Sequence, residues 1–80
     1  MQIKKVIVDR FIALCEKEGI KPNELATKSG VTPSTVYSML DSSRGDINIS
    51  TIKKLCDGLQ ISIADFFNTD EFRELEQEIK

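Results

Sequence analysis

The chain has 80 residues, of which 40% are hydrophobic and 30% are charged, and its formal net charge is −2. This length supports one domain with a small core, and the hydrophobic content excludes a wholly disordered chain. The sequence shows no apolar run that could span a membrane, and its first twenty residues lack the pattern of a secretory signal. We therefore expect a cytoplasmic protein with no membrane partner.

The reactive residue types are sparse. The chain contains no histidine, which is the commonest general base and metal ligand, and its two cysteines are too few for a disulfide scaffold or a zinc finger. Its four glycines form no phosphate-binding loop, and a core this small rarely encloses a substrate cavity. We expect no catalytic residue, no metal, no cofactor and no small-molecule ligand.

The charge is unevenly distributed. Residues 1–64 carry nine Lys and Arg against seven Asp and Glu, a net charge of +2, whereas residues 65–80 carry two against six, a net charge of −4. The acidity therefore belongs to the C-terminal segment. The body is mildly basic, which permits a surface that faces phosphates.

Apolar residues recur at helical spacing along the chain, which predicts an all-α fold. The β-branched run at 6–8 would also suit a strand, but the chain offers no partner strand. The first three predicted helices are Ile3–Glu18, with an inward stripe at 3, 7, 11, 14 and 15, then Pro22–Ser29 and Pro33–Leu40. A fourth, capped by Asn48 or Ser50, carries Ile52, Leu55, Cys56 and Leu59, and a fifth, capped by Ser62, carries Ile63, Phe66 and Phe67. An amphipathic acidic helix is predicted over 68–80.

Residues 22–40 form the most informative segment. Two helices of about eight residues, joined by a tight turn at Gly30–Thr32, are typical of a helix-turn-helix. Ala26 is small enough for two helices to cross closely, and Gly30 can take the positive φ that such a turn needs. The second helix then exposes a slim face of Ser34, Thr35, Tyr37 and Ser38, which fits the DNA major groove. The same four side chains would also suit an ordinary solvent-exposed face.

The strings PNELATKSGVTPSTVYSML and INISTIKKLCDGLQISIADFF resemble the Cro/repressor-type (XRE-like) helix-turn-helix family. The resemblance covers about residues 6–67 and rests on the L-A-x-x-x-G-V turn, the T-x-S-T-V start of the third helix and the apolar close ending at Phe67. It implies a five-helix, lambda-repressor-like DNA-binding domain over 1–67. In this family the third helix reads the major groove, and the starts of the second and fourth helices approach phosphates.

Carried over by position, the resemblance assigns two sets of residues. The base-reading set is Thr32, Pro33, Ser34, Thr35 and Ser38, with Tyr37 flanking it. The phosphate-facing set is Arg44, Asn48, Ser50 and Thr51, to which charge alone adds Lys28 and Lys53. Arg44 would also suit an ordinary solvated loop.

Four features depart from the family pattern, one of which is that Asp41, Ser42 and Ser43 replace the small residue common near the end of the third helix. Pro22 stands where family members often have a phosphate-binding Gln, and the third helix presents no Arg, Gln or Asn for bidentate base contacts. Gln60 stands where a Gly often ends the fourth helix, at a cost of about 1 kcal/mol if its φ is positive.

Outside the helix-turn-helix, Cys15 and Cys56 fall on inward stripes and are expected to be buried, reduced thiols. The C-terminal segment 68–80 carries a stripe of Phe72, Leu75 and Ile79. This stripe either packs on the first helix near Ile3 and Ile7 or forms a homodimer interface. The sequence leaves these two interpretations open.

Two hypotheses for function remain. The first is a bacterial or phage-encoded transcriptional regulator, active at the nucleoid, that binds double-stranded DNA as a homodimer on two related half-sites. The second is a protein-interaction module of the antitoxin or adaptor type that uses a helix-turn-helix fold with little or no DNA binding. The acidic segment and the third helix without Arg or Gln favour the second hypothesis.

Overall fold

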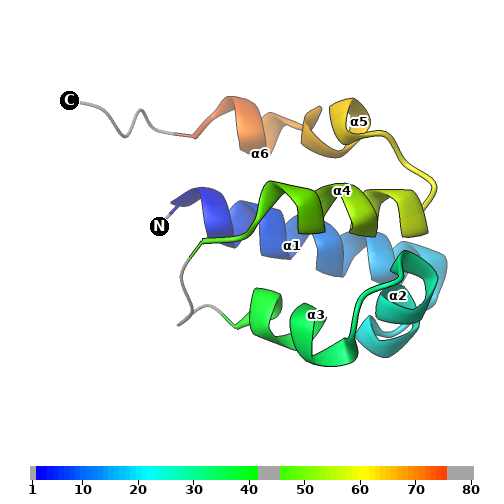
Figure 1. The fold of residues 1–80 in the computed structure, drawn as a ribbon. Helices are drawn as coiled ribbons and strands as arrows, with labels where there is room; N and C mark the ends of the chain where they lie inside the picture. The colour runs from blue at the N-terminus through cyan, green and yellow to red at the C-terminus, as the bar shows by residue number, and fades with distance from the viewer. Residues whose placement is uncertain (1, 42–45, 76–80) are drawn as a thin grey trace.

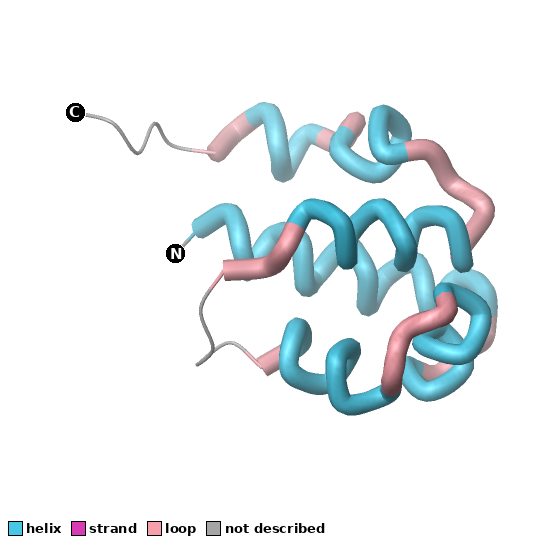
Figure 2. The backbone as a smooth tube through the Cα atoms, viewed as in Figure 1, coloured by secondary structure: helices cyan, strands magenta, loops and turns pink. Residues whose placement is uncertain are grey.

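The computed structural model describes residues 2–41 and 46–75, and within these ranges the chain forms six helices and no strand. Figure 1 shows α5 and α6 on one side, α1 and α4 in the middle, and α2 and α3 on the other side. Figure 2 traces the loops that join them. The helices are α1 (Gln2–Glu18), α2 (Pro22–Ser29), α3 (Pro33–Leu40), α4 (Ile49–Gly58), α5 (Ile63–Phe67) and α6 (Asp70–Arg73).

The all-α prediction is confirmed, and α2 and α3 have the predicted bounds. The first helix begins at Gln2, one residue earlier than expected, and the β-branched run at 6–8 is helical, with Ile7 and Val8 buried and Val6 half-buried. Gly19 and Gly30 end α1 and α2 with φ values of 68° and 70°, which favour a residue without a Cβ. None of the helices in the described ranges has the length and apolar character needed to cross a membrane.

Side-chain caps fix where α3, α4 and α5 begin. The Thr32 hydroxyl accepts a hydrogen bond from the backbone N–H of Thr35, and Ser62 accepts one from Asp65. Asn48, rather than Ser50, caps α4, because its side-chain oxygen accepts from the Ser50 N–H at 2.7 Å. Each cap satisfies an N–H that has no partner within its own helix.

A single hydrophobic core joins the first five helices. Ala26 is fully buried, which fits the close crossing predicted for the helix-turn-helix, whereas Ile3 is 36% exposed and lies outside the core despite its place on the predicted stripe. The buried cluster consists of Ile7, Phe11, Cys15, Leu25, Ala26, Val36, Met39, Ile52, Leu55, Cys56 and Phe66.

Both cysteines belong to this cluster as free thiols, as predicted. Burial raises the pKa of the Cys15 and Cys56 thiols, and the negative charge of the neighbouring Asp57 carboxylate raises the pKa of Cys56 further. Both groups are therefore protonated at neutral pH. Because the folded-state pKa values are raised, the stability that this burial confers is retained at neutral pH and lost as the pH rises above the thiols' unfolded pKa values.

The helix-turn-helix is held to the rest of the molecule through α4, which packs closely on α2. Gly58 lies at the tightest point of this contact. A Cβ added to Gly58 would come within 2.1 Å of the Ser29 hydroxyl oxygen and 3.1 Å of the Ser29 Cα. The absence of a side chain at Gly58 therefore sets how near α2, and with it α3, approaches the core.

Arg10 on α1 forms hydrogen bonds that hold α5 in place. Its guanidinium donates to the carbonyl of Phe66 at 3.0 Å and to the carbonyl of Asp65 at 3.2 Å, and it lies 5.8 Å from the centre of the Phe66 ring. These are carbonyls in the last turn of a five-residue helix, where a cation is favourable. The long-range contact holds α5 against α1.

Over the described residues, the predicted C-terminal helix is shorter than expected. Helix α6 ends at Arg73, so Leu75 lies beyond it rather than on a helical face with Phe72, and Ile79 falls outside the described residues. The like charges of Asp70 and Glu74, four residues apart, oppose a further helical turn, and so short a segment needs packing to be helical.

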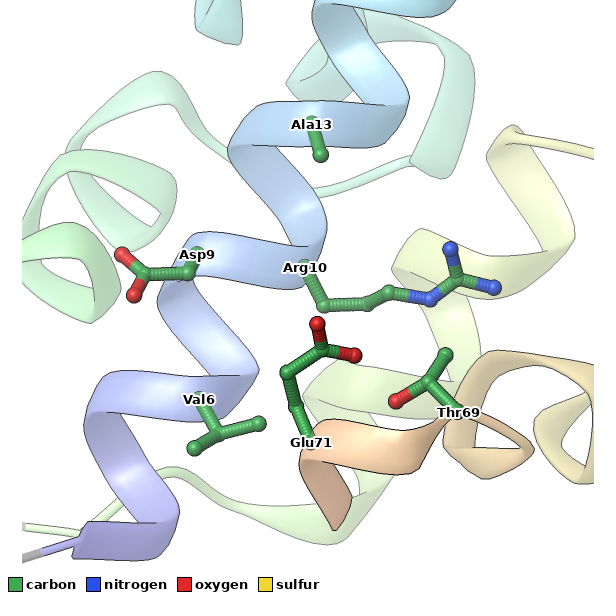
Figure 3. Close-up of a pocket in the computed structure, with 6 residues that line it drawn as sticks. All are labelled: Val6, Asp9, Arg10, Ala13, Thr69 and Glu71. Atoms are coloured by element: carbon green, nitrogen blue, oxygen red, sulfur yellow. The ribbon is translucent and has the colours of Figure 1, made fainter.

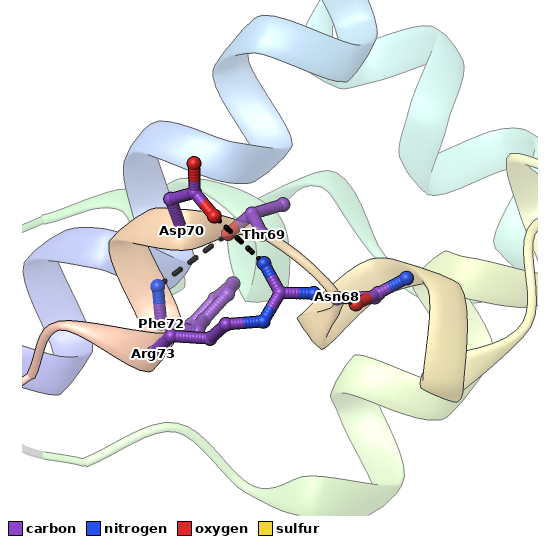
Figure 4. A network of polar contacts seen from close by, with 5 residues as sticks. All are labelled: Asn68, Thr69, Asp70, Phe72 and Arg73. Atoms are coloured by element: carbon purple, nitrogen blue, oxygen red, sulfur yellow. Dashed lines mark hydrogen bonds and ion pairs between the residues drawn. The ribbon is translucent and has the colours of Figure 1, made fainter.

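Helix α6 is a short turn capped by Thr69, as Figure 4 shows. The Thr69 hydroxyl accepts from the Phe72 N–H at 3.5 Å, and the Arg73 guanidinium donates to the Asp70 carboxylate at 2.8 Å and to the Asn68 side chain. The Phe72 ring lies 4.8 Å from the Phe67 ring. Phe72 is therefore partly covered by the chain's own aromatic residues, while α6 packs on α1.

Gln60 has a φ of 59°, the backbone conformation expected from the family's glycine at this position. Replacing it with glycine removes the strain of a Cβ in the left-handed region, which is partly offset by the greater flexibility of an unfolded glycine. We expect Gln60→Gly to stabilise the fold by about 0.5–1 kcal/mol, raising Tm by roughly 2–8 °C in thermal unfolding followed by circular dichroism. The control Gln60→Ala keeps the Cβ, and an equal gain from it would contradict this explanation.

Candidate nucleic-acid interface

The turn between α2 and α3 is fixed by backbone hydrogen bonds. The N–H of Val31 donates to the carbonyl of Ala26 at 3.1 Å, and the N–H of Gly30 donates to the carbonyl of Thr27 at 3.4 Å. Together with the extended backbone of the Thr32 cap, they reverse the chain within three residues. The result is a helix-turn-helix in which α3 packs mainly on α2.

Helix α3 has two distinct faces. Val36 and Met39 point into the core, with 0% and 6% exposure, whereas the Tyr37 side chain on the opposite side is 52% exposed. All six positions assigned to base reading are exposed: Thr32, Pro33, Ser34, Thr35, Tyr37 and Ser38. The structure therefore brings this predicted set together on one accessible surface.

Hydrogen bonds order the hydroxyls at the start of this surface. The Thr32 hydroxyl lies 3.2 Å from the Ser34 hydroxyl and 2.9 Å from the Thr35 hydroxyl, and it accepts from the Thr35 N–H at 3.3 Å. A hydroxyl offers one donor and two acceptor lone pairs, so these groups retain capacity for a further partner. The cap that starts α3 also orients its first polar side chains.

A hollow of about 190 Å³ lies between α3 and the start of α4. It places Thr35 and Ser38 from the base-reading set beside Asn48 and Thr51 from the phosphate-facing set. Its lining residues are Lys4, Thr35, Ser38, Met39, Asp46, Ile47, Asn48 and Thr51. The N-terminus of α4, where backbone N–H groups favour anions, therefore borders the exposed face of α3.

Ser50, Lys53 and Lys28, which also belong to the phosphate-facing set, do not line this hollow. Ser50 is exposed in the first turn of α4, whereas the Lys53 amine forms an ion pair with the Asp57 carboxylate on the same helix. Lys28 lines another hollow with Asp57 and Glu18, at the other end of α4. Arg44 falls outside the described residues. Neighbouring carboxylates thus weaken the positive field that Lys28 and Lys53 present.

Two residues that the sequence analysis did not select also border this surface. Ile49 is 61% exposed between Asn48 and Ser50, although its apolar side chain suggests a core position. Lys4 is buried against the C-terminal end of α3. The sequence did contain a sign that Lys4 is buried: it stands three residues before Ile7 and seven before Phe11, and this spacing places it on the core-facing stripe of α1.

Another hollow lies on the other side of α1, at α6. It measures about 400 Å³ and is lined by Val6, Asp9, Arg10, Ala13, Thr69 and Glu71, as Figure 3 shows. Its charges are mixed, and Arg10 turns toward α5 rather than toward the hollow's acids. Within the described ranges, no group of His, Cys, Asp and Glu gathers that could hold a metal ion.

Comparisons with known proteins agree with this geometry. The family model of the Cro/C1-type HTH DNA-binding domain matches residues 10–71. The crystal structure of prophage Lp1 protein 11 is similar to this chain, with a TM-score of 0.80 and 29% sequence identity over 90% of this chain and 95% of that one. A comparison with curated proteins gives no significant match.

The family match spans α2, the turn, α3 and α4, which are the elements that build the exposed surface described above. The similar solved structure extends the likeness to the whole arrangement of helices. The family resemblance and the all-α architecture expected from the sequence are therefore confirmed. This chain belongs to the Cro/C1-type helix-turn-helix DNA-binding family.

Proposed function

We propose that this protein is a sequence-specific transcriptional regulator that inserts α3 into the major groove of double-stranded DNA. The observation that carries the proposal is the row of small polar side chains exposed on α3 beside the first turn of α4. A helix of this slimness fits the groove, which is roughly 12 Å wide. The base-reading residues are Thr32, Pro33, Ser34, Thr35, Tyr37 and Ser38.

Phosphates bind at the start of α4. Asn48, Ser50 and Thr51 surround a helix N-terminus that favours anions, and Arg44, four residues before Asn48 in the sequence, adds positive charge. Lys28 and Lys53 act as outer contacts, and Lys53 does so after exchanging the Asp57 carboxylate for a phosphate. Because much of the affinity comes from such contacts, binding weakens steeply with rising salt.

Two copies bind together as a homodimer on an operator with two related half-sites. Figure 1 shows α5 and α6 on the side of the molecule away from α3, so a partner bound at the C-terminal segment leaves α3 accessible. Two-fold symmetry then places the half-sites about 10 base pairs apart, or a multiple of this. We place this activity at the nucleoid, in the cytoplasm of a bacterium that encodes the protein itself or in a resident phage genome.

Selection of bound duplexes from a random pool tests this function directly. We expect enrichment of a short sequence repeated with two-fold symmetry at a spacing of about one helical turn. Enrichment of a single half-site would reject the homodimer and retain the DNA-reading role. No enrichment, together with no retention on random duplex at low salt, would reject the proposed function.

One observation favours a second function, that of a protein-interaction module. The exposed face of α3 carries no Arg, Gln or Asn, the residues that make the strongest base contacts, and residues 65–80 have a net charge of −4. Heparin chromatography at low salt separates the two functions. A DNA-binding chain is retained and elutes with salt, whereas a module devoted to a protein partner passes through.

A further inference from the structure

Lys4 is a charged side chain in an unusual position. It lies in the first turns of α1, and 7% of it is exposed, which makes it the one charged residue that is buried within 2–41 and 46–75. Its amine donates a hydrogen bond to the backbone carbonyl of Asp41 at 2.7 Å. A buried cation is costly unless it is paired or bonded, so its burial points to a specific role for this contact.

The contact joins segments 37 residues apart and ends at the C-terminus of α3. Asp41 is the C-cap residue of α3, and this helix has no basic residue in its last turn. Lys4 supplies the missing cation from α1, where it meets the negative end of the α3 dipole. The turn connects the start of α3 to α2. The Lys4 contact holds the other end of α3, at its C-terminus.

The position of α3 depends on such end contacts because the helix has only eight residues, of which Val36 and Met39 are buried. Helices of this length are not stable alone and take their orientation from what they pack against. Lys4 also lines the hollow that contains Thr35, Ser38, Asn48 and Thr51. It therefore lies beneath the junction of the base-reading and phosphate-facing sets.

We propose that Lys4 is a positioning residue for DNA reading: by holding the C-terminal end of α3 against α1, it fixes the angle at which the exposed face of α3 meets the bases. This inference rests on the proposed function. Exposed lysines add general attraction to phosphates, whereas Lys4 acts through Asp41 and α3. Its loss therefore reduces discrimination between sequences more than it reduces affinity for any duplex.

The test compares Lys4→Met with the matched control Lys5→Met. Methionine retains much of the aliphatic stem of lysine and removes the cation and the donor. Lys5 is the neighbouring residue, its side chain is 75% exposed, and its removal changes the net charge by the same amount. A third variant, Lys4→Arg, keeps a cationic donor and tests for rescue.

The first measurement is the ratio of affinities for a duplex selected by the unaltered protein and for a random duplex of equal length. We expect Lys4→Met to lower this ratio about tenfold, roughly the effect of one mismatched base pair. We expect Lys5→Met to leave the ratio unchanged and Lys4→Arg to restore most of it. An equal ratio in Lys4→Met and Lys5→Met would overturn the proposal.

The second measurement needs no DNA. Amide hydrogen exchange of residues 38–41, followed by NMR, reports local opening at the end of α3. Exchange should be about tenfold faster in Lys4→Met than in Lys5→Met, while core amides such as that of Leu55 stay protected. Unchanged exchange at 38–41 would overturn the proposal. If Lys4→Met does not fold, Lys4→Gln, which retains a neutral donor, is measured with the same two criteria.

The two proposals fail in different ways. If the unaltered protein binds no duplex, the proposed function fails, and the exchange measurement alone decides whether Lys4 holds α3. If the unaltered protein selects a sequence but Lys4→Met discriminates as well as Lys5→Met does, the function stands and the role of Lys4 is rejected.

Discussion

Replacing both Ser34 and Ser50 with glutamate is expected to weaken duplex binding strongly without unfolding the protein. Both residues are exposed in the first turns of their helices, α3 and α4, where an acidic side chain favours the helical state. On the proposed DNA surface the same carboxylates face phosphates and bases. Such juxtaposition of like charges should lower affinity roughly 10²- to 10³-fold, measured by fluorescence anisotropy with a selected duplex.

The matched control carries the same charge change elsewhere. Ala13→Glu plus Ala64→Glu also adds two negative charges at exposed positions, on α1 and α5. Ala13 borders the α1–α6 hollow, and α5 lies on the side of the molecule away from α3 (Figures 1 and 3). Both double variants are compared on a duplex that carries one half-site, so that any effect of this control on the homodimer does not enter, and the control should then reduce affinity only modestly through long-range repulsion. Equal losses in the two double variants, with helical content unchanged in both, would reject the assigned surface.

Phe66→Ala is expected to be the most damaging single change to stability. Phe66 is fully buried, its ring centre lies 4.4 Å from that of Phe11, and it also contacts the rings of Phe67 and Phe72. Removing a buried phenylalanine ring costs about 3–5 kcal/mol. A domain of this size has a total free energy of unfolding of roughly 4–12 kcal/mol, so Tm should fall steeply or the transition should be lost.

Phe67→Ala provides the comparison, because it removes the same ring from the next position, where the side chain is only half-buried. Urea unfolding of both variants should place Phe67→Ala much closer to the unaltered protein, at a cost of about 1–2 kcal/mol. Similar midpoints for the two variants would show that α5 contributes less to the core than its burial indicates.

The sequence was most informative where structure depends on neighbouring residues. Helical periodicity predicted α1 to α5, and local chemistry predicted their ends, because a cap bonds an N–H two or three residues away. The helix-turn-helix was predictable for the same reason, since α2, the turn and α3 are contiguous. The exposed set on α3 followed from the inward positions of Val36 and Met39, which leave the polar residues of the helix on its other faces.

The sequence was less informative about charge. Lys53 was assigned to phosphate by its sign alone, but its amine pairs with the Asp57 carboxylate four residues on, a spacing that the sequence does display. Ile49 is apolar by type, yet it is 61% exposed in the first turn of α4, directly after the Asn48 cap.

The sequence by itself determined the class of fold, five of the six helices, and the candidate face of α3, because these depend on periodicity and on caps within a few residues. Only the tertiary structure showed that Lys4 reaches the end of α3, that Arg10 fastens α5, and that Phe72 packs on Phe67 while α6 stops at Arg73. The first two contacts join residues 37 and 56 positions apart. Which residues meet over such a separation depends on how whole helices pack against one another, and patterns among neighbouring residues do not show this packing.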